Sequence, residues 1–132
     1  MEKLPPKKLP SKIRNARYFQ APEYCGTEQY HKINSFGLVG TDGALYAFKT
    51  LEAFWVGDII ASYISQMRKT GDTFFVARVF IKEDGGADFY IDDGNYNVLI
   101  YQEIPYTDLK ENLQLYVTNE GKYYLTLLPS EY

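Results

Sequence analysis

The amino-acid sequence predicts a small α+β protein in which one long helix packs on a five-stranded antiparallel meander sheet. Three observations carry this prediction: a length of 132 residues, which suits one domain, a helical hydrophobic period over residues 50–67, and an alternating period after Gly71. We expect residues 1–20 to form a disordered basic tail and residues 21–132 to form a single α+β domain, whose N-terminal region is irregular.

The predicted tail is basic and rich in proline. Residues 1–20 carry six Lys and Arg side chains against Glu2, a formal charge of +5, so the net charge of −3 leaves −8 on the remainder. Proline disfavours regular structure, and a charged segment with few apolar residues buries too little surface to fold. A solvated tail is therefore expected, and an arm that touches nucleic acid or an acidic partner is the alternative.

Residues 23–49 are the irregular part of the predicted domain. Thr41-Asp42-Gly43 is a turn signal, because Asp and Gly suit the left-handed positions of tight turns. The flanking segments 36–39 and 45–48 predict a short hairpin or, in place of its second strand, a single helical turn.

A helix is predicted over residues 50–67. Thr50 suits its N-cap, and Glu52 complements the helix dipole in the first turn. Arg68, Lys69 and Gly71 are typical of a helix C-terminus. One face of this helix is apolar and consists of Trp55, Val56, Ile59, Ile60, Tyr63, Ile64 and Met67.

Five short strands are predicted after the helix, because apolar and polar residues then alternate between turn signals rich in Asp, Asn and Gly. Tight turns between consecutive strands are typical of an antiparallel meander. Its apolar face needs a cover, which the helix supplies. The strands fall near residues 74–81, 88–92, 98–104, 113–118 and 123–127.

Composition disfavours several classes of protein. No stretch approaches the roughly 20 apolar residues that cross a bilayer, and no apolar segment follows the N-terminal lysines as in a secretory signal. Cys25 is the single cysteine, so an intramolecular disulfide cannot form. We expect a cytoplasmic protein without membrane contact, cofactor or metal, because the chain has too few His and Cys residues for zinc and no phosphate-binding glycine pattern.

Cys25 and His31 are the candidate catalytic residues, because they are the only side chains of their kinds. A Cys–His pair in contact gives a thiolate nucleophile with the imidazole as its base. Such a pair would make the protein a small cysteine-dependent hydrolase or transferase. The spacing does not by itself bring the two side chains together, and no orienting acid is indicated. A half-buried cysteine and a hydrogen-bonded histidine are the alternative, and we favour a protein that is not an enzyme.

The sheet face opposite the helix is the predicted binding surface. If the apolar residues of the strands point toward the helix, Tyr and Arg side chains point away, and these types are enriched in interface hot spots. Exposed aromatic rings also stack bases, but an acidic body favours a protein partner. Strand-forming tyrosines that pair across the sheet are the alternative. The predicted partner-binding residues are Arg78, Asp88, Tyr90, Asp92, Tyr101, Glu103, Tyr116 and Tyr124.

Five short segments between residues 25 and 132 carry a family resemblance. They are GTEQYH (26–31), TDG (41–43), AFWVGDIIASY (53–63), QEIPYTD (102–108) and LLPSEY (127–132). In combination they resemble an uncharacterised bacterial family, a domain of unknown function. The resemblance implies a small stand-alone protein, in some members carried on mobile elements. It implies no activity and no functional residues.

The leading hypothesis is a non-enzymatic protein-binding module. Its sharpest form is an inhibitor, encoded by a phage or mobile element, of a host nucleic-acid-targeting (defence) complex. An acidic body can occupy the basic nucleic-acid channel of such a complex. Direct contact with nucleic acid is expected only through the basic tail. The Cys25–His31 enzyme and a homo-oligomeric structural protein, such as a homodimer, are the alternatives.

Overall fold

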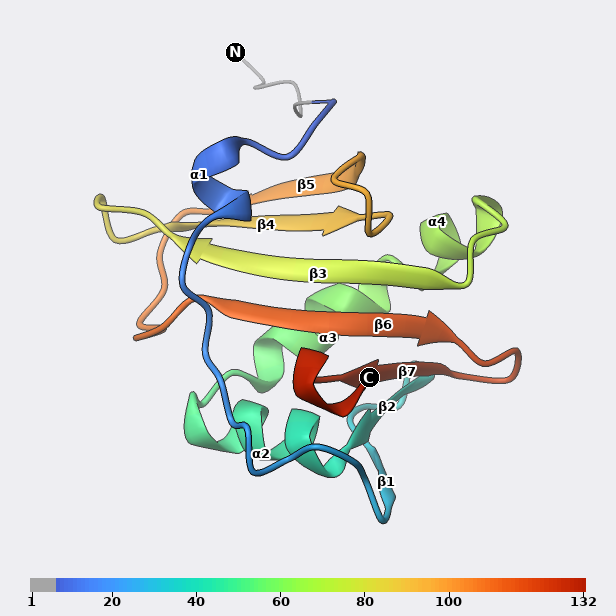
Figure 1. Ribbon diagram of the computed structural model, residues 1–132. Coiled ribbons are helices and arrows are strands. Elements are labelled where there is room, and N and C mark those ends of the chain that lie inside the picture. The colour runs from blue at the N-terminus through green and yellow to red at the C-terminus, as the bar shows by residue number, and fades with distance from the viewer. Residues whose placement is uncertain (1–6) are drawn as a thin grey trace.

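Residues 7–132 are described by the computed structural model, in which seven strands form one mixed sheet accompanied by four short helices (Figure 1). The α+β class predicted from the sequence is confirmed. None of the helices within these residues is long and apolar enough to cross a membrane. The strands are β1 (Tyr30–Lys32), β2 (Leu38–Thr41), β3 (Phe74–Ile81), β4 (Ala87–Asp92), β5 (Val98–Ile104), β6 (Leu113–Asn119) and β7 (Tyr124–Leu127). The helices are α1 (Ser11–Arg14), α2 (Asp42–Thr50), α3 (Phe54–Ser62) and α4 (Ile64–Lys69), and a 3₁₀ turn, η1 (Pro129–Glu131), follows β7.

The strand order is β1-β2-β7-β6-β3-β4-β5, so the predicted five-strand meander is wrong. β6 pairs with β3 instead of β5, and β2 joins β7 in the one parallel pairing of this sheet. The β5–β6 connection, residues 105–112, contains no glycine and is longer than a hairpin turn, so it carries the chain past β4 to the free side of β3. The predicted hairpin of 36–39 with 45–48 is also wrong, because residues 45–48 lie in helix α2, as the alternative of a helical turn expects, and β2 pairs with β1.

The predicted single helix over residues 50–67 is wrong, because α2 ends at Thr50 and two short helices, α3 and α4, follow it. α2 begins after Thr41, whose side chain accepts a hydrogen bond from the Ala44 N–H as an N-cap. Thr50, the expected N-cap, is instead the last residue of α2. Tyr63 then separates α3 from α4.

The turn between α2 and α3 has the hydrogen bonds of a Schellman motif. The Ala53 N–H donates to the Phe48 carbonyl at 2.8 Å, and the Glu52 N–H donates to the Lys49 carbonyl at 3.3 Å. Glu52 occupies the left-handed position with a φ of 52°, where glycine is usual. Because no glycine marks this helix end, the hydrophobic period alone extends the predicted helix across it.

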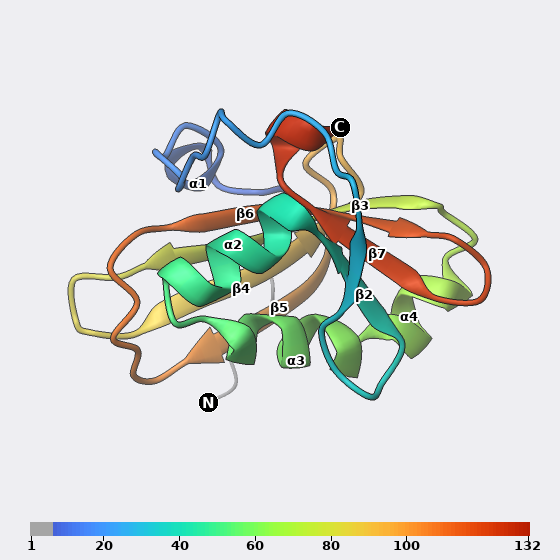
Figure 2. The ribbon, with the colours of Figure 1, turned by 90° about the horizontal axis from the view of Figure 1, so that it is seen from below.

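Helices α2 and α3 cover one face of the sheet, and the N-terminal segment covers the other (Figure 2). Figure 2 shows α2 and α3 on one face and α1, with the chain that follows it, on the other. The main core lies between the sheet and α2 and α3. Burial of this apolar surface is the principal source of stability. Its fully buried side chains include Phe48, Ile60, Phe75, Phe89 and Val117.

Residues 7–19, which we call the N-terminal strap, cross the sheet face opposite α2 and α3, which we call the outer face (Figure 1). Leu9 and Ile13 are buried against Tyr90 in a second, smaller apolar cluster. The sequence predicts a disordered tail over residues 1–20, whereas residues 7–20 lie on the sheet and include α1. Residues 1–6 of the predicted tail lie outside the described residues.

Candidate functional site

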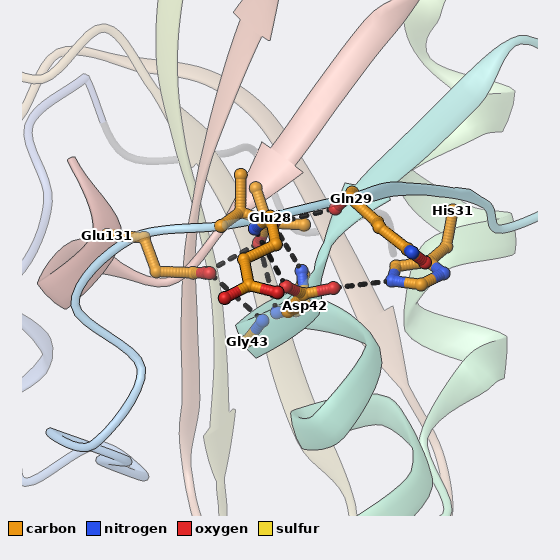
Figure 3. A network of polar contacts seen from close by, with 9 residues as sticks. Glu28, Gln29, His31, Asp42, Gly43 and Glu131 are labelled. Atoms are coloured by element: carbon orange, nitrogen blue, oxygen red, sulfur yellow. Dashed lines mark hydrogen bonds and ion pairs between the residues drawn. The ribbon is translucent and has the colours of Figure 1, made fainter.

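A network of polar contacts joins distant segments at the N-terminus of α2 (Figure 3). The carboxylate of Glu131, from η1, accepts hydrogen bonds from the Thr41 hydroxyl and, at 3.0 Å, from the Gly43 N–H. It also accepts one from the Leu128 N–H at 3.0 Å. A carboxylate suits this position, because unpaired N–H groups and the helix dipole favour negative charge at a helix N-terminus.

Asp42 forms the other half of the network (Figure 3). His31 Nε2 lies 2.7 Å from Asp42 Oδ1, and the Glu28 N–H donates to Asp42 Oδ2 at 2.9 Å. The hydrogen bond with His31, followed by those from the backbone of Glu28 and Gln29, lowers the pKa of the Asp42 carboxyl. The Thr27 hydroxyl accepts from the Asp42 N–H at 2.9 Å. These contacts fasten residues 27–31 to the start of α2.

Three of the segments that carry the family resemblance meet in this network. Residues 26–31, 41–43 and 127–132 supply its side chains. The parallel pairing of β2 with β7 brings the third segment beside the other two. Both carboxylates are already bonded to N–H, O–H or imidazole groups, so the arrangement is that of a structural lock. We call Thr41, Asp42 and Glu131 the α2 lock.

The predicted catalytic pair, Cys25 and His31, is not brought together near the α2 lock. The Cys25 thiol is exposed, and within residues 7–132 it has no hydrogen bond to His31, which contacts Asp42 instead. A hollow of about 380 Å³ opens beside His31 and Asp42, lined also by Tyr24, Tyr46 and other side chains. Asp42 is an acid in contact with His31 that the sequence did not indicate, but covalent catalysis also requires a nucleophile in contact with the ring. The Cys25–His31 enzyme therefore stays a prediction without geometric support.

The described part of the chain contains no group of three or more His, Cys, Asp or Glu side chains that could hold a metal ion. The predicted partner-binding residues range from fully buried to exposed positions on the sheet. Strand register places all of them except Tyr124 on the outer face.

Arg78, Tyr90 and Asp92 lie on the outer face but beneath the N-terminal strap. Arg78 Nε and Asp92 Oδ1 form an ion pair at 2.9 Å, with side chains only 5% and 0% exposed. Tyr90 is buried against Leu9 and Ile13, and burial raises its pKa to about 12. The expectation of an exposed surface is wrong for these residues, because the strap covers them, and their role in partner binding stays a prediction.

Asp88, Tyr101 and Glu103 take part in a polar cluster around Lys82 at the same face. Lys82 Nζ lies 3.6 Å from Asp88 and 3.5 Å from Glu103, and the Tyr101 hydroxyl donates to Asp88 at 2.8 Å. Although burial opposes it, the carboxylates of Asp88, Asp84 and Glu103 together raise the pKa of Lys82. Burial and the hydrogen bond to Asp88 raise the pKa of Tyr101. Glu103 alone of the predicted residues here is well exposed.

Tyr116 and Tyr124 occupy opposite faces. Tyr116 is half-buried on the outer face, with the rings of Phe74 and Tyr132 at 4.9 and 5.3 Å between centroids. The prediction that Tyr124 points outward is wrong, because it is fully buried in the main core. The β6–β7 register explains this. Leu125 and Leu127 lie opposite Thr118 and Tyr116, which are on the outer face, so these two leucines share that face and Tyr124, one residue before Leu125, points the other way. Tyr124 therefore falls on the inner face.

Comparison with known proteins identifies the family. The model of DUF6876, a family of unknown function, matches residues 20–132. The chain belongs to this family. The resemblance stated from the sequence is thereby confirmed, and the matched region leaves out the N-terminal strap. No curated protein and no solved structure matches the chain.

A further group of aromatic side chains lies at the surface of the DUF6876 domain, and we call it the aromatic surface: Phe54, Trp55 and Tyr106. Trp55 is half-buried and lines two adjoining hollows. The first, of about 470 Å³, includes Phe54 and Glu52, and the second, of about 250 Å³, includes Tyr106 and other residues. Trp55 is predicted from the sequence as part of a buried helix face. The overlooked signal is Tyr106, an aromatic residue directly after Pro105 in a long connection.

Proposed function

We propose that this DUF6876 protein is a non-enzymatic protein-binding module whose contact site is the aromatic surface. The observation that carries the proposal is the pair of hollows that share Trp55. Phe54 is 40% exposed and Tyr106 is 77% exposed. Solvent contact at large aromatic rings is unfavourable, and a partner that covers them recovers that free energy.

The residue types of the aromatic surface support protein binding. Trp and Tyr are enriched among the few residues that supply most of the free energy of a protein interface, and they act best when they fill or line small pockets. Trp55 is the single tryptophan of the chain. It lies between the two hollows, so one partner segment laid across them would contact Phe54, Trp55 and Tyr106 together.

The charges beside the aromatic surface favour a basic partner segment. Glu52 lines one hollow and Asp108 the other, with Lys49 as the basic residue at the first. Residues 21–132 carry a formal charge of −8, because the first 20 residues hold +5 of a net −3. Arg or Lys side chains of a partner would meet these carboxylates and the face of Trp55. The basic channel of a nucleic-acid-targeting complex has this chemistry, which keeps the inhibitor hypothesis as the sharpest form of the proposal.

Affinity capture with matched variants tests the proposal. The tagged protein is incubated with host lysate at low and high salt, and the retained proteins are identified by mass spectrometry. We expect one stoichiometric partner whose retention falls with salt and whose capture is lost with Tyr106→Ala and with Phe54→Ala. Phe36→Ala, at a side chain that is 71% exposed elsewhere, is the control and should capture normally. Equal capture by all three variants would refute the aromatic surface as the site.

A further inference from the structure

The N-terminal strap is held on the outer face by two aliphatic anchors. Leu9 and Ile13 are 2% and 0% exposed and contact Tyr90, with Phe80, Val98 and Tyr101 partly buried around them. This cluster is separate from the main core, against which Phe19, the last residue of the strap, packs. The strap also lies outside the region that matches the family, residues 20–132. The DUF6876 domain therefore carries an apolar site whose occupant comes from an appended segment.

Backbone hydrogen bonds hold the strap at both ends. At the edge of β5, the Leu9 N–H donates to the Tyr96 carbonyl at 2.8 Å, and the Val98 N–H donates to the Lys7 carbonyl at 3.0 Å. At the other end, the Phe19 N–H donates to the Asn112 carbonyl at 2.7 Å. Strand-edge pairing supplied by the backbone, with side-chain anchors that give selectivity, is a recurring way in which domains bind extended peptides.

The strap brings positive charge to this face. The Lys12 ammonium lies 5.8 Å from the ring centre of Phe80, and the Arg14 guanidinium lies 4.5 Å from that of Tyr96. Both rings belong to the outer-face strands or to their connecting turns. Beneath the strap, the ion pair of Arg78 with Asp92 is self-neutralising, so the surface presents aromatic faces more than net charge to the strap.

We propose that the outer face of β3–β5 is a peptide-binding surface that residues 7–19 occupy in cis. The surface takes a basic segment that pairs with the β5 edge and then forms a short helix. Its two aliphatic side chains lie four positions apart, as Leu9 and Ile13 do. A partner protein that carries such a segment binds by replacing the strap. This surface lies on the opposite side of the sheet from α2 and α3, so the proposal is independent of the aromatic surface and either one can fail alone.

Cutting the strap free in the folded protein tests this proposal directly. A site-specific protease sequence is inserted at the exposed Gln20 of the full chain, and the folded protein is cleaved. A fluorescent peptide of residues 1–19 is then added and its binding is followed by anisotropy. We expect one-to-one exchange into the cleaved protein and none into the uncut chain, where the tethered strap has a local concentration in the millimolar range.

Variant peptides identify the anchors. Ile13→Asp in the peptide should weaken binding at least about 30-fold, because removing a buried aliphatic side chain costs 2 kcal/mol or more. Ser11→Ala, at an exposed position, is the control and should leave the affinity unchanged. Equal binding of the Ile13→Asp peptide, or no exchange at all, would overturn the proposal. Unfolding of the rest of the protein when the cleaved strap dissociates would also overturn the proposal, because a binding surface must persist without its ligand.

Hydrogen exchange in the uncut chain is a second test of the proposal. If the strap is a replaceable ligand, it opens while the sheet stays folded. The Leu9 and Val98 N–H groups, which bond strap to edge, should then show protection factors at least roughly tenfold lower than that of Val117 N–H in the sheet centre. Equal protection at all three would show that the strap opens only with the sheet, and would contradict the proposal.

Discussion

Replacing Glu131 with alanine should lower the free energy of unfolding by about 2–4 kcal/mol. Its carboxylate accepts hydrogen bonds from the Thr41 hydroxyl and from the N–H groups of Gly43 and Leu128. Hydrogen bonds to a charged group contribute about 1.5–3 kcal/mol each. The expected loss is smaller than the sum of three such contributions, because Glu131 is partly exposed and water can replace some of these hydrogen bonds. Loss of a charge at the α2 N-terminus adds about 0.3–1 kcal/mol.

Urea unfolding at neutral pH, followed by Trp55 fluorescence, measures this change. Glu131→Gln should lose less than Glu131→Ala, because its amide oxygen still accepts one or two of the hydrogen bonds. Glu23→Ala, at an exposed side chain, is the control and should change stability by less than about 0.5 kcal/mol. A Glu131→Ala protein as stable as the control would refute the α2 lock as a stabilising feature.

Three further predictions concern the lock and the strap-covered face. Asp92→Asn leaves Arg78 as a buried unpaired charge, so urea unfolding should show a loss of about 3–5 kcal/mol, and a loss near zero would contradict a dry ion pair. Stability should fall from about pH 10 to pH 12, because unfolded tyrosine ionises near 10 while burial raises the pKa of Tyr90 to about 12, so the unfolded state loses its proton first. Tyr90→Phe should reduce this loss of stability between pH 10 and pH 12, and an unchanged loss would show that another group causes it. Gly43→Ala would place a Cβ 2.5 Å from Glu131 Oε1, so it should destabilise the wild-type chain more than the Glu131→Ala chain.

The sequence predicts the fold class and the family, but not the arrangement of the sheet. Alternation after Gly71 does mark strands, as in β3 over residues 74–81. Strand order depends on which edges meet after collapse, and local alternation is the same whether β6 pairs with β5 or with β3. The α2–α3 break escapes prediction for a related reason: Glu52 takes a left-handed conformation without the glycine that normally signals it.

The α2 lock could be predicted only in part. Thr41 before a helical segment is an N-cap signal, and Asp42 suits a first turn. Nothing local indicates that Glu131 would reach them, because that contact depends on the parallel pairing of β2 with β7. The position of the strap is harder still to predict. Leu9 and Ile13 are two aliphatic residues among lysines and prolines, and their burial requires a complementary cluster around Tyr90 that forms only in the folded sheet.

The same composition that predicts an interface on the outer face also explains why that face is covered. Aromatic and Arg side chains gather there whether the segment that binds them comes from a partner or from the same chain. The strap carries positive charge onto an acidic body, and its tether gives it a high local concentration. If a partner replaces the strap, as we propose, its apparent affinity for the uncut chain is its intrinsic affinity multiplied by the fraction of molecules whose strap is open. Releasing the Ile13 anchor from Tyr90 increases that fraction, so a strap-destabilised chain should bind such a partner more tightly than the wild type does.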